Sequence, residues 1–191
     1  MSTRRASSAV QRRDGPIGRD AVVTAVLAAA VDLFAQKGPA ATSIRDVAAR
    51  AGINHGLLHR HFGTKEQLVG AVLDHLGQHV ADLIAAGAPG AEIEAAIDRQ
   101  LRVIARASLD GFPIGELQTR FPNVSLVLEP LLRLHSDELS ARLAAAQAIA
   151  LQLGWRLFED FLRASTGLDD LPTDQLQQSI NTEIARIITP H

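Results

Sequence analysis

The sequence predicts an all-α protein with about nine helices. Hydrophobic residues make up 47% of its 191 residues but aromatic residues only 4%. Ala and Leu dominate the apolar residues, which favours helices over sheets rich in Val, Tyr and Thr. Apolar residues also recur at helical spacing in successive segments that Gly or Pro separates. A chain of this length buries enough surface to fold without cross-links.

Several classes of protein are excluded or disfavoured by what the sequence lacks. The absence of Cys excludes disulfides, thiolate metal sites and cysteine nucleophiles. No apolar segment follows the N-terminal arginines, and no run reaches the roughly 18 apolar residues of a membrane helix. Neither a GxSxG, a Walker nor an HExxH motif is present. We therefore expect a cytoplasmic protein that is not an enzyme, needs no cofactor and does not enter a membrane.

Charge is divided unevenly along the chain. Residues 1–70 hold ten basic and five acidic side chains, whereas residues 71–191 hold nine basic and sixteen acidic ones. Residues 1–18 are rich in Ser, Arg and Gly and have almost no large apolar side chain, so we expect a disordered basic arm there. This asymmetry predicts that the N-terminal part contacts a polyanion.

A helix-turn-helix is predicted between residues 42 and 62, after a first helix at about 19–36. Thr42 or Ser43 can cap its first helix, Gly52 ends that helix, and Asn54 can cap the second. A small residue where the helices cross, a Gly in the turn and a branched apolar residue are the requirements of this motif. Ala48, Gly52 and Leu58 meet them in that order.

These residues resemble the tetracycline-repressor (TetR) family. The similarity rests on SIRDVA from residue 43 and AGINHGLLHRHFGTKEQL from residue 51, and covers about residues 19–70. It implies a helix-turn-helix DNA-binding domain at 19–67 and a larger effector-binding and dimerisation domain at 68–191. It also implies a repressor that leaves its operator when a small, largely apolar molecule binds. The alternative is a helical protein-interaction adaptor that does not bind DNA.

The helical phase of the second motif helix predicts its DNA-facing side. With Leu58 and Phe62 turned inward, Gly56, Leu57 and Arg60 face outward at about 100° per residue. Arg can bind guanine or phosphate, and Gly lets the backbone approach closely. The expected contacts with double-stranded operator DNA are Thr42, Ser43, Arg45, Asn54, His55, Gly56, Leu57, His59, Arg60 and Lys65.

Three positions depart from the family pattern. The family usually has Tyr where this chain has His59 and His61, and often Thr where it has Leu57. The spacing of His55 and His59, like that of His75 and His79, also suits a zinc site. Because neither pair has an obvious third ligand nearby, we interpret these histidines as contact or surface residues and predict no metal site.

The rest of the chain predicts further helices that provide a pocket and a dimer interface. Thr64 and Gln67 form a capping box for a fourth helix, and Gly111–Asn123 contains a short helix between loops. Pro130 kinks or begins a helix ending at Leu134. Ser136 caps a long helix that stops at Gly167. A last helix follows Pro172.

Two sets of residues in these helices are candidates for a function. The candidate effector-pocket residues are Arg102, Arg106, Phe112, Phe121, Leu126, Trp155 and Phe158. Aromatic residues of this kind also serve as core, and the arginines also fit a solvated helix face with local ion pairs. Because a helix-turn-helix protein normally pairs about a two-fold axis, we expect a homodimer. Its interface is predicted at Leu153, Leu157, Phe161, Leu176, Ile180, Ile184 and Ile187.

Overall fold

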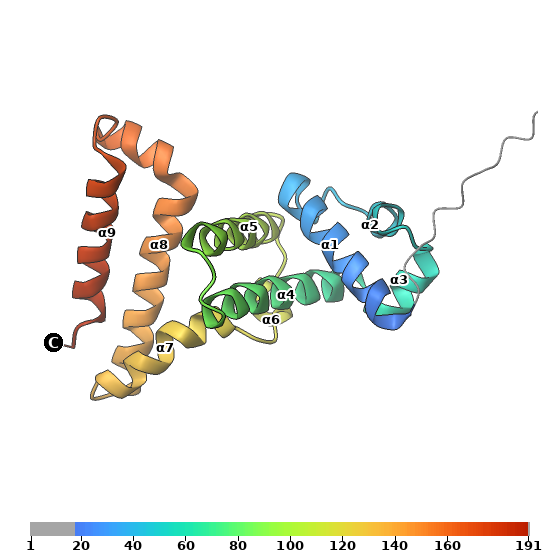
Figure 1. The fold of residues 1–191 in the computed structure, drawn as a ribbon, viewed down its shortest axis with the longest axis horizontal. Coiled ribbons are helices and arrows are strands. Elements are labelled where there is room, and N and C mark those ends of the chain that lie inside the picture. The colour runs from blue at the N-terminus through green and yellow to red at the C-terminus, as the bar shows by residue number, and fades with distance from the viewer. Residues whose placement is uncertain (1–17, 191) are drawn as a thin grey trace, which may run out of the picture.

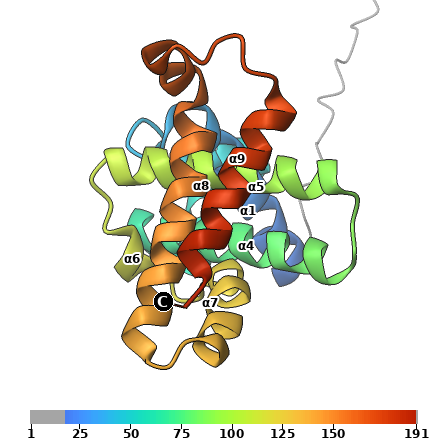
Figure 2. The same ribbon diagram turned by 90° about the vertical axis from the view of Figure 1, so that its left-hand side faces the viewer.

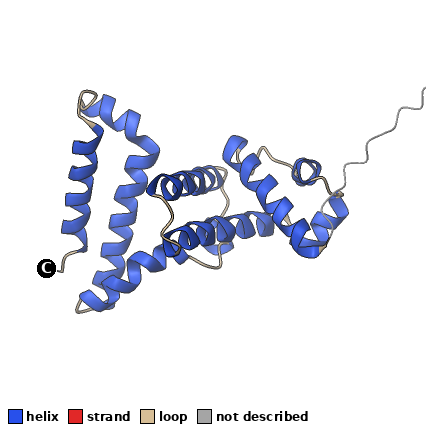
Figure 3. Ribbon diagram, in the orientation of Figure 1, coloured by secondary structure: helices blue, strands red, loops and turns tan. Residues whose placement is uncertain are grey.

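The computed structural model describes residues 18–190, which form nine α-helices and no strand (Figures 1 and 3). The all-α prediction is confirmed, and residues 1–17 of the arm predicted at 1–18 lie outside the described residues. The helices are α1 (Arg19–Lys37), α2 (Ile44–Ala51), α3 (His55–Phe62), α4 (Lys65–Ala85), α5 (Gly90–Leu109), α6 (Ile114–Leu117), α7 (Pro122–Leu134), α8 (Glu138–Thr166) and α9 (Thr173–Ile188). No helix in the described part of the chain is long and apolar enough to cross a membrane.

The N-terminal helices share one core with the helices that follow them. Phe34 of α1, Val47 of α2 and Leu58 of α3 are all buried in it. The same cluster includes Leu73 of α4 and Val103 of α5, so it crosses the predicted domain boundary after residue 67. That boundary stays a prediction, and the shared core ties α1–α3 firmly to α4 and α5.

Helix α4 runs through the middle of the molecule and has close neighbours on several sides (Figure 1). It packs against α1, α3, α5, α6 and α7. Gly70 allows a close approach of α6, because a Cβ there would collide with the backbone carbonyl oxygen of Leu117. At Gly70, α6 therefore packs directly against the backbone of α4, the helix that connects the two ends of the protein.

Helices α8 and α9 lie side by side at the end of the molecule opposite α2 and α3 (Figures 1 and 2). Asp137 caps α8 by accepting a hydrogen bond from the Ser140 backbone N–H at 2.9 Å. The predicted Ser136 cap is therefore wrong by one residue. Helix α7 begins at Pro122 and continues through Pro130, and α8 is kinked at Phe158.

Candidate functional site

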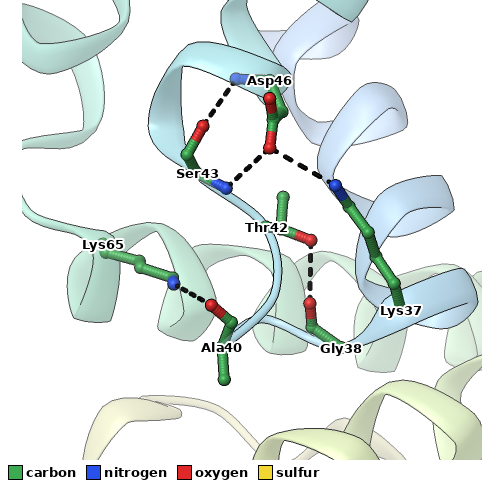
Figure 4. A network of polar contacts seen from close by, with 7 residues as sticks. All are labelled: Lys37, Gly38, Ala40, Thr42, Ser43, Asp46 and Lys65. Atoms are coloured by element: carbon green, nitrogen blue, oxygen red, sulfur yellow. Dashed lines mark hydrogen bonds and ion pairs between the residues drawn. The ribbon is translucent and has the colours of Figure 1, made fainter.

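The turn between α1 and α2 is held by a network of polar contacts (Figure 4). Ser43 and Asp46 form a capping box, in which the Asp46 N–H donates to Ser43 Oγ at 3.1 Å and the Ser43 N–H donates to Asp46 Oδ2 at 3.0 Å. Lys37 Nζ donates to the same carboxylate oxygen at 3.3 Å. The bond from the Ser43 backbone, followed by those from Ser43 and Lys37 side chains, lowers the pKa of Asp46. The start of α2 is thus fixed by its own sequence.

Thr42 is part of this turn and not of the surface. Its side chain is only 1% exposed, and its hydroxyl donates to the Gly38 carbonyl oxygen at 2.7 Å. The predicted DNA contact by Thr42 is therefore wrong, because its hydroxyl is buried and already used. The exposed Ser43 keeps a hydroxyl hydrogen to donate, and Arg45 is also exposed.

The turn between α2 and α3 is specified closely by the sequence. Gly52 has a φ of 70°, which a residue with a side chain rarely adopts. Asn54 then caps α3, its Oδ1 accepting a hydrogen bond from the Leu57 N–H at 2.7 Å. Leu58 is fully buried, as its predicted inward orientation requires. The helix-turn-helix geometry predicted from the sequence is present.

The side of α3 opposite the buried Leu58 is exposed to solvent. Four residues on adjacent turns of this side are exposed: His55, Gly56, His59 and Arg60. Arg60 forms no ion pair with any residue between 18 and 190, and neither does Arg45. Arg50, by contrast, is turned toward α1, where it pairs with Asp32 at 2.9 Å. Two unpaired guanidinium groups thus lie on the surface that α2 and α3 present.

Leu57 is less exposed than the phase argument predicted. It is half-buried, packs against the core, and lines a hollow with Arg19, Val22 and Arg60. The hollow lies between the first turn of α1 and the outer side of α3. Leu57 is therefore at the edge of the exposed surface and not at its centre.

Lys65 also differs from its predicted position. Its ammonium donates to the Ala40 carbonyl oxygen at 3.2 Å (Figure 4). The same ammonium lies 5.9 Å from the centre of the Phe112 ring. In this conformation Lys65 joins the α1–α2 turn to the segment after α5, so the structure does not present its charge to a phosphate. Phe112 belongs to the same junction and packs against the N-terminal core.

A cavity of about 420 Å³ lies among α4, α5, α6, α7 and α8. Its wall is mostly apolar, with contributions such as Val80, Ile97, Ile104, Val127 and Ile149. The volume falls in the range of small-molecule sites, which combine an apolar wall with a few polar groups. The predicted effector-pocket residues Phe121 and Leu126 line this cavity.

The other predicted pocket residues lie elsewhere. Arg102 lines a shallow hollow between α1 and α5, and Arg106 is exposed beside Gly38. Trp155 does not line the cavity, and Phe158 is exposed at the kink of α8. These four residues and Phe112 do not line this cavity, because helical phase alone does not say which neighbour each face of a helix meets.

The polar residues of the cavity were not predicted. They are Gln100, Gln118, Asn123, Gln152 and Arg156. Gln100 could have been predicted from the sequence, since it occupies an inward position between Ile97 and Ile104 on an otherwise apolar stripe. Asn123 could not, because Asn after Pro122 is also typical of a turn.

Helix α8 carries an exposed apolar stripe on the outside of the molecule. Its residues recur at helical spacing and are Leu139, Leu143, Ala146, Ala150, Leu157 and Phe161. Phe161 is 67% exposed. Contiguous apolar surface of this kind marks an interaction site.

Three predicted interface residues have other roles within the chain. Leu176 is 4% exposed and Ile180 is also buried, because α9 packs them against its neighbours, and Leu153 lines the cavity. The predicted interface contacts of these residues are thus not supported. Leu157 and Phe161 are available on the stripe, and Ile184 and Ile187 are half-buried.

Comparison with known proteins gives the family. Residues 26–72 match the profile described as bacterial regulatory proteins, tetR family. The Mycobacterium tuberculosis H37Rv protein named HTH-type transcriptional repressor Rv3405c is 56% identical over 191 residues, which is 100% of both chains. The Mycobacterium bovis HTH-type transcriptional regulator Mb3439c is equally similar over the same length. This chain belongs to the TetR family.

A more distant relative matches over a shorter stretch. The HTH-type transcriptional repressor KstR2 of Rhodococcus jostii is 37% identical over 78 residues, or 39% of this chain and 38% of that protein. The TetR-family assignment makes this chain a DNA-binding transcriptional regulator and not an enzyme. It also favours the regulator over the adaptor that the sequence left open.

The histidine pairs of this TetR-family regulator show no metal-site geometry in the part of the chain that the structure describes. No three or more His, Asp or Glu side chains gather there in a way that could hold an ion. His75 and His79 instead face a groove between α1, α4 and α5. Burial, and secondarily the charge of His79, lowers the pKa of His75, which favours its neutral form.

Proposed function

We propose that this regulator is a homodimeric repressor that binds operator DNA through α3 and releases it when a small, largely apolar molecule occupies the cavity. The observation that supports it most is the connection between an exposed recognition helix and a largely apolar cavity through α4 and α5. The full-length relative named a repressor supports the direction of regulation. A protein with this role acts where the DNA is, in the cytoplasm.

In the proposed complex, α3 enters the major groove with its exposed side toward the bases. Arg60 binds guanine or a phosphate, and Gly56 lets the backbone approach closely. Asn54, His55 and His59 add hydrogen bonds, with Leu57 at the edge of the contact. Ser43 and Arg45 at the start of α2 bind the DNA backbone and fix the orientation.

The proposed dimer forms through the α8 stripe, together with the neighbouring surface of α9. The stripe lies at the end of the protein opposite α3, so a two-fold axis there leaves both recognition helices free (Figure 1). Pairing would bury Leu143 and Phe161 against a second copy of the chain. Two recognition helices held about 34 Å apart match successive turns of the major groove.

The protein has one conformation that fits DNA and one that does not. Release requires the effector to have a higher affinity for the conformation that does not fit DNA. The cavity wall contains Val80 of α4 and Ile114 of α6, so an occupant can change how these helices pack. Helix α4 continues to Lys65, and α5 leads to the junction at Phe112. Both routes end at the α1–α2 turn that positions α2 and α3.

The experiment that tests this function is selection of bound sequences from random DNA, followed by titration of the selected duplex at several salt concentrations. Six phosphate contacts per dimer predict a log–log slope of about −5 for the binding constant against salt. Selection of a two-fold symmetric sequence would support the dimer. Failure to select any sequence, together with no salt dependence, would contradict DNA binding and favour the adaptor.

A further inference from the structure

The amide groups of Gln100, Gln118 and Asn123 form a cluster packed against α4. Asn123 Nδ2 donates to Gln100 Oε1 at 2.6 Å, and Gln118 Nε2 donates to the Arg120 carbonyl oxygen at 2.7 Å. Gln100 is only 5% exposed. A Cβ on Gly77 would lie 3.3 to 3.5 Å from all three amides, so the cluster is packed against the backbone of α4.

One atom of this cluster lacks a partner. Asn123 Oδ1 is buried and accepts no hydrogen bond from residues 18–190, and it is the one buried side-chain polar atom there in that condition. Buried polar atoms are normally hydrogen-bonded, and an unpaired one is unfavourable. The oxygen has no accessible surface in this arrangement, so an O–H group on an occupant of the cavity becomes its donor only when the Asn123 side chain rotates toward that occupant.

The charge of the cavity argues against an anionic occupant. Arg156 is the one charged side chain among the described residues that line it. Its guanidinium binds Asp98 at 3.0 Å and also forms an ion pair with Glu94. Two carboxylates therefore already neutralise this arginine, and a carboxylate ligand would lose hydration without gaining a free cation.

We propose that the effector is a neutral, largely apolar molecule carrying a hydroxyl group, and that this hydroxyl donates a hydrogen bond to Asn123 Oδ1. The inference rests on the proposed function, because it specifies the chemistry of the same cavity. The apolar body of the molecule lies against Ile97, Ile104 and Val127. Rotation of Asn123 toward this hydroxyl takes its oxygen away from Gly77, so binding bears directly on the packing of α4.

The test uses matched probes on three apolar skeletons of roughly ten to twelve carbons, namely decyl, cyclododecyl and naphthyl-ethyl. Each skeleton is supplied as an alcohol, as its methyl ether and as a carboxylate. Binding to the full-length protein without DNA is measured by calorimetry. We expect at least one alcohol to bind about tenfold more tightly than its ether, the ratio that one hydrogen bond gives, and more tightly than its carboxylate.

Asn123→Leu should abolish the preference for alcohol over ether while leaving the ether affinity similar. Asn181→Leu is the control, because Asn181 is exposed on α9 and lies outside the cavity. Stronger binding of carboxylates, equal binding of alcohol and ether, an unchanged preference in Asn123→Leu, or no binding by any skeleton would overturn the inference. The ranking in the wild-type protein decides the matter even if Asn123→Leu does not fold.

A separate measurement distinguishes this inference from the proposed function. The best alcohol is added to the complex of the protein with its selected DNA. If it binds the free protein with the expected preference but does not release DNA, the ligand chemistry stands and the proposed release is wrong. If a carboxylate releases DNA and no alcohol does, release stands and the ligand chemistry is wrong.

Discussion

The carboxylate of Asp110 accepts a hydrogen bond from the backbone N–H of Ala40 at 2.7 Å, and so joins the end of α5 to the α1–α2 turn. The two residues are 70 positions apart in the chain. Gly38 lies in the same contact, since a Cβ there would be 2.8 Å from Asp110 Oδ2. Together with Lys65 at Ala40 and Phe112, this bond makes the α5–α6 corner a second connection, besides α4, between the cavity and the DNA-binding helices.

Asp110→Ala should lower the free energy of unfolding by about 1 kcal/mol, since the Ala40 N–H loses its charged acceptor and water replaces it only in part. Urea unfolding measures the change. Asp170→Ala, in the exposed segment between α8 and α9, is the control and should alter stability by less than about 0.5 kcal/mol. If both changes lower the free energy of unfolding equally, the bond between Asp110 and Ala40 does not contribute to stability.

Gly70→Ala should destabilise the protein by about 1–3 kcal/mol, although Ala favours helices. The reason is the collision of its Cβ with the Leu117 carbonyl oxygen, which forces α6 away from α4. Gly90→Ala, where a Cβ meets nothing within 4 Å, should be neutral or slightly stabilising. Denaturant titration of both variants measures the difference, and a Gly70→Ala variant as stable as Gly90→Ala would contradict the close approach.

Asp46→Asn should weaken the dependence of stability on acid pH. The hydrogen bonds of Asp46 lower its folded-state pKa below the ordinary value of 3.8. Its contribution is therefore complete above that value and is lost as the pH falls through the lower pKa of the folded state. Unfolding followed from neutral pH down to below 3.8 should show a shallower acid loss in Asp46→Asn than in the wild type. Identical pH profiles would show that the capping box does not favour the ionised carboxyl.

Phe161→Glu should convert the proposed dimer to a monomer, because it places a charge in the apolar stripe of α8. Sedimentation at micromolar concentration measures this. The control is Leu109→Glu, which replaces a leucine that is 88% exposed at the end of α5, outside the stripe. A wild-type protein that sediments as a monomer, or a Phe161→Glu variant that still dimerises, would contradict the proposed interface.

Local features of the fold could be read from the sequence, because neighbouring residues specify them. The Asn54 cap, the left-handed Gly52 and the inward Leu58 each depend on a few residues of one segment, and all three are present. The cap of α8 was misplaced by one position, since Ser136 and Asp137 are both good capping residues.

Features that depend on contacts between distant segments could not be predicted in this way. Thr42 is a good N-cap residue in isolation, and only the packed turn shows that its hydroxyl is used by Gly38. The kink of α8 lies at Phe158 itself, which is exposed there and does not line the cavity as predicted. Leu153 lies on the apolar side of α8 as expected, but the way α8 crosses α5 and α7 turns it into the cavity.

The central claim is that the exposed side of α3 contacts DNA, and Arg60→Ala tests it most directly. Binding of the selected duplex is measured by fluorescence anisotropy for the wild type, Arg60→Ala and Arg133→Ala, an exposed arginine of α7 that serves as the control. The predicted result is about a tenfold or larger loss of affinity for Arg60→Ala, which corresponds to the roughly 1–3 kcal/mol of one base contact, and no loss for the control. Equal affinity of Arg60→Ala and the wild type would contradict the claim.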